Sequence, residues 1–113
     1  MDTKILEGQW TGTFHIAAGL ATQYGTLDIR VAADGTFEGK GIDNDVPEVV
    51  TGKFIGLNID FPSYNFEIHI YGPTYGGSAR LMDDGSIQMH GGGYNAGSLT
   101  ATLNRAAQEG ANV

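Results

Sequence analysis

The sequence predicts an all-β protein, a small antiparallel meander barrel of about eight strands, and three observations support this. Runs in which apolar and polar residues alternate with period two recur along the chain, and no helical period does. Eighteen glycines, against three prolines, are spread through the 113 residues and indicate many tight turns. These turns fall roughly every 8 to 12 residues, a spacing typical of barrels and sandwiches. Because closure removes unpaired strand edges, we expect a barrel, with a two-sheet β-sandwich as the alternative.

The first half of the chain predicts three strands. Residues 9–16 place Trp10, Phe14 and Ile16 on one face and polar residues on the other, which is typical of a half-buried strand. After a long loop expected over residues 18–25, residues 26–31 alternate again. They lead into Asp34-Gly35, a dipeptide that favours a tight hairpin. The third strand, over residues 36–42, follows directly.

The second half continues the same pattern with shorter runs. We expect an acidic loop over 43–48, a strand over 49–55 and a short apolar run over 59–61 that ends at Pro62. Further strands are expected over 66–70, 79–81, 87–90 and 99–103, with hairpins over 72–77 and at Asp84-Gly85. The prediction is one barrel domain over residues 1–105 and a frayed tail over 106–113.

Composition and charge exclude several classes of function. The net charge is −7, and the six basic residues are scattered singly, whereas nucleic-acid binding needs a basic cluster. There is no cysteine, so we expect no disulfide and no thiol chemistry, and a reducing compartment, the cytoplasm, suits the chain. No stretch approaches the roughly 20 apolar residues that span a bilayer, so we expect no membrane partner.

The sequence carries no signature of catalysis or of metal binding. The run 90–93, His-Gly-Gly-Gly, is similar to the oxyanion-hole motif of esterases, but no G-x-S-x-G nucleophile motif accompanies it. His15, His69 and His90 lack the short spacing of metal ligands. The acidic run 43–45 lacks the glycine and terminal glutamate of a calcium-binding loop. We therefore predict a non-enzymatic protein with no metal and no cofactor.

Gly8-Gln9-Trp10 at the start of the first strand, the succession of antiparallel strands and Arg105 just after the last one resemble the calycins, the group of lipocalins and avidins. This resemblance implies a lipocalin-like barrel that is closed at one end. It implies that Trp10 plugs the closed end and that Arg105 packs over the indole as a structural cation–π contact. It also implies an open mouth at the other end, with a small ligand held inside.

In a meander, successive loops alternate between the two ends of the barrel, and this alternation predicts which loops lie at that mouth. If the strands form a meander, the loops at 18–25, 43–48, 62–65 and 83–85 share the end opposite Trp10. That end is then acidic, which favours a neutral or cationic ligand over an anion. The candidate ligand-binding residues are Phe14, Ile29, Phe37, Phe54, Phe66 and Ile68 in the apolar lining, with Tyr24 and Tyr64 as amphipathic contacts at the mouth.

Two functions remain open on the sequence. The first is a binding protein that holds a small apolar or amphipathic molecule inside the barrel. The alternative is a protein–protein interaction or regulatory module, a homodimer with a filled barrel, that presents Tyr71, Tyr75 and Tyr94 as contact residues. An interior cavity would favour the first function, and a filled barrel with an exposed aromatic patch the second.

Overall fold

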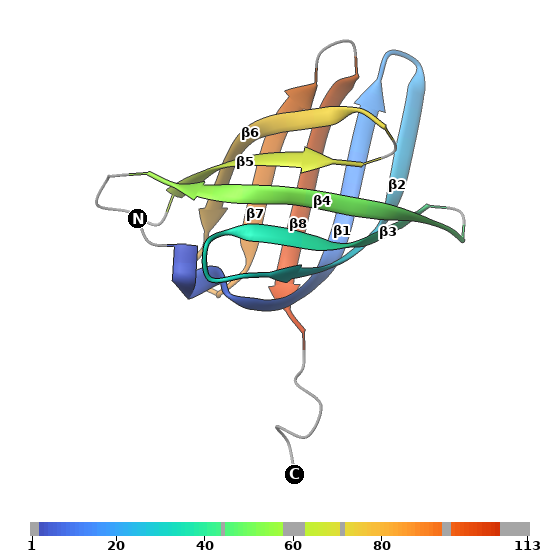
Figure 1. Ribbon diagram of the computed structural model, residues 1–113. Helices are drawn as coiled ribbons and strands as arrows, with labels where there is room; N and C mark the ends of the chain where they lie inside the picture. The colour runs from blue at the N-terminus through green and yellow to red at the C-terminus, as the bar shows by residue number, and fades with distance from the viewer. Residues whose placement is uncertain (1–2, 44, 58–62, 71, 94–95, 107–113) are drawn as a thin grey trace.

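The computed structural model describes residues 3–43, 45–57, 63–70, 72–93 and 96–106. Within these residues the chain forms a closed antiparallel barrel in which each strand pairs with the next and β8 returns to β1 (Figure 1). The predicted all-β meander barrel is confirmed, and the alternative sandwich is wrong. A short 3-10 helix, η1 (Thr3–Leu6), precedes the strands. The strands are β1 (Gly8–Ala18), β2 (Ala21–Val31), β3 (Thr36–Asp43), β4 (Val46–Gly56), β5 (Ser63–His69), β6 (Thr74–Leu81), β7 (Ile87–Gly93) and β8 (Gly97–Arg105).

The long loop expected after the first strand is absent, and that prediction was wrong. β1 and β2 stay paired from Gly8↔Val31 to Ala18↔Ala21, so only two residues turn the chain. One of these, Gly19, has φ 63°, which glycine adopts without strain. Residues 21–25 carry one large side chain, Tyr24, and it faces outward, so their alternation of apolar and polar residues is weak in the sequence. Their pairing with β1 makes them a strand nevertheless.

The assignment of loops to the two barrel ends also needs correction. The run 59–61, expected as a strand, lies outside the described residues, and β4 pairs directly with β5. Because β4 pairs directly with β5, each later turn lies at the opposite end of the barrel from the one predicted. The turn at 83–85 and the first residues of β5 therefore lie at the Trp10 end. The acidic groups at the opposite end are Asp43, Asp45 and Glu48, and Glu48 lies within β4 rather than in a loop.

The barrel interior is filled by inward-facing apolar side chains, and several aromatic rings lie over glycines of the neighbouring strand. Phe14 pairs with Gly25, and Phe37 pairs with Gly52. A Cβ built on Gly25 would stand 2.5 Å from the Phe14 ring, and one on Gly52 would stand 2.5 Å from the Phe37 ring. The rings therefore occupy space that any larger residue would need, an arrangement in which an aromatic residue covers a strand glycine. Phe66 with Gly77 and Tyr75 with Gly93 repeat the pairing.

The two Asp-Gly hairpins have the same geometry and lie at the same end of the barrel. In the first, the Asp34 carboxylate accepts hydrogen bonds from the Thr36 amide at 3.0 Å and hydroxyl at 2.7 Å. In the second, Asp84 accepts the equivalent bonds from Ser86 at 2.9 and 2.7 Å. These bonds lower the pKa of both carboxyls below the ordinary value of 3.8. Each hairpin closes with a glycine at positive φ, 94° at Gly35 and 88° at Gly85.

Of the predicted tail, residues 107–113 lie outside the described part of the chain. Ala106 still donates its amide to the carbonyl of Gln9 at 2.9 Å, so the β1–β8 ladder extends one residue beyond Arg105. No helix among the described residues is long and apolar enough to cross a membrane.

Candidate functional site

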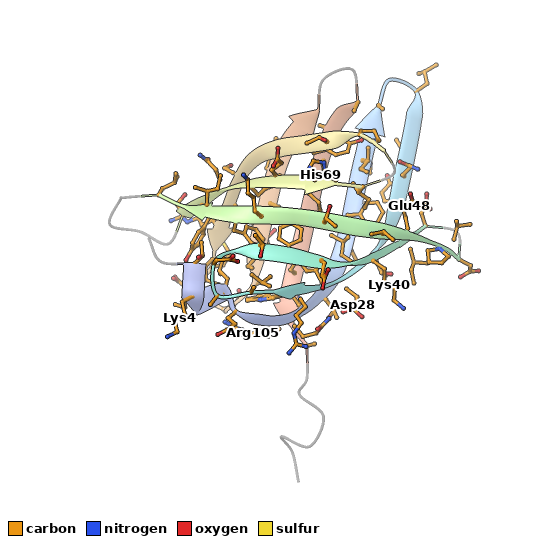
Figure 2. The ribbon with its side chains drawn as sticks, in the orientation of Figure 1. Lys4, Asp28, Lys40, Glu48, His69 and Arg105 are labelled. Atoms are coloured by element: carbon orange, nitrogen blue, oxygen red, sulfur yellow. The ribbon has the colours of Figure 1, made fainter. Side chains whose placement is uncertain are left out.

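One end of the barrel is closed by Trp10, Arg105 and η1. The Trp10 side chain is fully buried and its indole N–H donates to the Leu6 carbonyl at 2.7 Å. The Arg105 guanidinium carbon lies 4.5 Å from the centre of the indole ring, within the range of a cation–π contact. The same guanidinium donates to the carbonyls of Glu7, at 2.8 Å, and Ile5. Arg105 and Lys4 lie at this end in Figure 2. Arg105 thus fastens the segment before β1 across the base of the barrel.

The half of the interior above this base is packed with aromatic rings. The rings of Phe37 and Phe54 have centres 5.0 Å apart, and Phe54 meets Tyr64 edge-on at 6.5 Å. Tyr64 was expected in a mouth loop, but it lies in β5, faces inward and is 1% exposed. Ile29 packs in the same core. Three of the candidate lining residues therefore gather near the closed end, together with Tyr64.

Phe14, Phe66 and Ile68 are also buried in the interior. Phe66 lies directly opposite Phe54 on the neighbouring strand, and Ile68 lies opposite Tyr75, toward the end of the barrel away from Trp10. Tyr75 closes this region, since its hydroxyl donates to the Ala96 carbonyl at 3.1 Å. Burial raises the pKa of the Tyr75 hydroxyl. The prediction that Tyr75 is a surface contact residue was wrong, because strand register turns it inward. Tyr71 and Tyr94, expected beside it, lie outside the described residues.

Tyr24, the remaining candidate, lies on the outer face of β2. Its ring stacks on the His15 imidazole with centres 4.3 Å apart and planes within 5° of parallel. The Tyr24 side chain is 64% exposed. It therefore contributes to the outer surface of the barrel and not to its lining.

A groove of about 690 Å³ runs over the outer face of β1, β7 and β8 and reaches β2 and β6. Polar side chains from these strands line it, among them Thr13, His15, Gln88, His90 and Thr100. Sequence reasoning assigned these residues only to the polar faces of separate strands. The alternation signal was present, and the predicted closure makes the first and last strands neighbours, but the sequence did not give the register between them. Among the described residues there is no group of three side chains able to hold a metal ion.

No protein-family model matches the chain, and no curated protein matches it. Among solved structures it is similar to a designed protein, described as the de novo design of a fluorescence-activating beta barrel, with a TM-score of 0.65. The likeness covers 94% of this chain and 99% of the designed one at 16% sequence identity. An identity this low shows a shared barrel fold and carries no residue roles with it.

Proposed function

We propose that this protein is a non-enzymatic binding protein that holds a small apolar or amphipathic molecule inside its barrel. The observation that carries the proposal is the asymmetry of the two ends. The Trp10 end is fastened by Arg105 and η1, whereas the opposite end is bounded by hairpins and by the hydroxyl contact of Tyr75. A barrel of eight strands has an interior just wide enough for core side chains or one small ligand. Because side chains fill the interior of this barrel, a ligand enters only when inward-facing rings turn aside. The likeness to a designed fluorescence-activating barrel fits this proposal.

The ligand site lies in the half of the interior opposite Trp10. Its walls are the rings of Phe14 and Phe66, and each ring lies over a glycine, Gly25 for Phe14 and Gly91 for Phe66. A ring that turns away from a glycine leaves space beside bare backbone, so a ligand needs few side chains to move. Ile68 supplies the apolar floor. Phe37, Phe54 and Tyr64, packed on one another near the closed end, support the site from below.

The charge at this end favours a neutral or cationic molecule. Asp43, Asp45 and Glu48 lie at or beside the β3–β4 turn. Carboxylates near a site entrance raise the local concentration of cations and lower that of anions.

The test compares two neighbouring substitutions on β8. Ala101 faces inward and is 5% exposed, so Ala101→Leu fills the proposed site. Thr100 faces outward, so Thr100→Leu is the matched control of the same size. Native mass spectrometry and fluorescence titration with Nile red, a neutral apolar probe, would measure binding. We expect 1:1 saturable binding that Ala101→Leu weakens at least tenfold and Thr100→Leu leaves unchanged.

Circular dichroism establishes that each variant folds, and Ala79→Val, another inward-facing change, replaces Ala101→Leu if that variant does not. Binding that responds to Thr100→Leu alone would place the probe on the outer face and contradict the proposal. A clean ligand-free mass with no saturation by Nile red or by a cationic dye would also contradict it.

A second candidate is the partner-binding module, and the apolar rim opposite Trp10 favours it. Leu20, in the β1–β2 turn, is fully exposed, and Val46 and Val49 of β4 are 57% and 76% exposed. Residues 21–25 extend β2 beyond its pairing with β3, so Leu20 and the two valines form two separate apolar points, and exposed apolar side chains of this kind are typical of contact surfaces. Sedimentation equilibrium tests the homodimer. A dimer that Leu20→Asp dissociates supports this candidate, and a monomer at all concentrations contradicts the homodimer.

A further inference from the structure

The outer groove is built from two rows of polar side chains that cross five strands. Cross-strand pairing sets Tyr24, His15, Thr100, His90 and Ser78 side by side in the first row. The second row runs parallel to it and contains Thr26, Thr13, Thr102, Gln88 and Arg80. Directly opposed residues in antiparallel strands have Cβ atoms about 5 Å apart, so each row is a continuous line of hydrogen-bonding groups.

The groove differs in charge from the rest of the barrel surface. None of the described residues that line it carries a carboxylate, although the chain has thirteen acidic residues. Arg80 contributes a guanidinium, and the other polar side chains of the lining bear hydroxyl, imidazole and amide groups. Figure 2 shows Asp28, Lys40 and Glu48 on the side of the barrel formed by β2, β3 and β4. Charge is thus concentrated on one side, and neutral donors and acceptors on the other.

An aromatic surface stands at one edge of the groove. The Tyr24 ring is held parallel to the His15 imidazole by their stacking, so its orientation is set before any ligand arrives. It remains 64% exposed, which leaves apolar ring surface available. Aromatic rings with polar neighbours suit a ligand that is apolar on one face and polar at its edge.

Two hydrogen-bonding groups in the lining have unused capacity. The His15 Nε2 atom is buried beneath its neighbours and has no hydrogen-bond partner among the described residues. Leaving a buried polar atom unsatisfied is costly, so a ligand that shifts the neighbouring side chains and pairs with this nitrogen removes that cost. The Thr102 hydroxyl donates to the Gln88 side-chain oxygen at 2.9 Å. That bond directs the Gln88 oxygen toward Thr102 and leaves its two N–H groups as donors.

We propose that this groove is a second binding site, for a neutral carbohydrate. A pyranose ring has an apolar C–H face for Tyr24 and equatorial hydroxyls that both donate and accept, as the rows of Thr, Gln and His side chains require. A purely apolar ligand would leave these groups unpaired, and a cation would meet Arg80 without any carboxylate in the described lining. This site is separate from the interior site and does not depend on it.

The test is a titration of the ¹⁵N-labelled protein with maltose, cellobiose, lactose and N,N′-diacetylchitobiose at millimolar concentrations, followed by amide chemical shifts. We expect saturable shifts for at least one sugar, concentrated at His15, Gln88 and Thr100. Tyr24→Ala and Gln88→Ala should each weaken that binding at least tenfold. Tyr24→Phe, which retains the ring, should weaken it less than threefold.

Ile55→Ala, on the exposed face of β4 away from the groove, is the matched control and should leave the affinity unchanged. Nile red reports on the interior and the sugars report on the groove, so the two sites succeed or fail separately. The proposal is overturned if none of the four sugars shifts the groove amides, or if binding survives Tyr24→Ala and Gln88→Ala. Shifts confined to interior residues would overturn it as well.

Discussion

Gly52→Ala tests whether aromatic rings seated on glycines fill the barrel. A Cβ at residue 52 would stand 2.2 Å from the Glu67 carbonyl oxygen and 2.5 Å from the Phe37 ring. The carbonyl belongs to β5, which pairs with β4 at this level, so relieving the clash must strain the ladder. Overpacking of this kind costs about 1–3 kcal/mol. Replacing a strand glycine with alanine otherwise gains about 0.5–1 kcal/mol, so the expected net effect is a loss of about 1 kcal/mol.

Urea denaturation followed by circular dichroism measures the free energy of unfolding of each variant. Gly76→Ala is the matched control, because its nearest neighbour to a new Cβ is the Phe66 carbonyl oxygen at 3.5 Å. It should be neutral or slightly stabilising. The double variant Gly52→Ala/Phe37→Leu should recover the part of the loss that the ring causes. Wild-type stability for Gly52→Ala would refute the packing argument.

Three further predictions concern the two ends and the core. Arg105→Ala should lower the free energy of unfolding by about 1–3 kcal/mol and shift the Trp10 emission maximum, since it removes the cation–π contact and two hydrogen bonds to carbonyls. Arg105→Lys should recover only part of the lost stability. An unchanged Trp10 emission maximum in both variants would contradict this role. Phe54→Ala should lower the free energy of unfolding by about 3–5 kcal/mol because it opens a cavity in the core. Urea denaturation measures this loss, and a value below about 1 kcal/mol would mean that the core collapses around the cavity. The Asp34 and Asp84 carboxyls have lowered pKa values in the folded protein, so their stabilisation is present above pH 3.8 and is lost as the pH falls through the folded values. Thermal melts between neutral and acid pH should show a smaller acid-induced loss for Asp84→Asn than for wild type, and an identical loss would contradict the assignment.

Local features of the chain were readable without the fold. Period-two alternation located most strands, because one face of each is buried against the core. The Asp-Gly dipeptides located two hairpins, since their turn geometry depends only on neighbouring residues. The resemblance to calycins led to the pair formed by Trp10 and Arg105, which lie in contact across the β1–β8 junction.

Local periodicity and turn chemistry were therefore enough to predict the all-β class, the meander order and the apolar set that fills the barrel. Which residues share a face at each level depended on strand pairing across the whole barrel. Pairing with β1 made residues 21–25 a strand, and the direct β4–β5 pairing moved Tyr64 and the 83–85 turn to the Trp10 end. The outer groove depends wholly on closure, because residues near 13 and 102 become neighbours only when β8 pairs with β1. Local sequence does not determine this long-range register, because the packing of the whole barrel sets it.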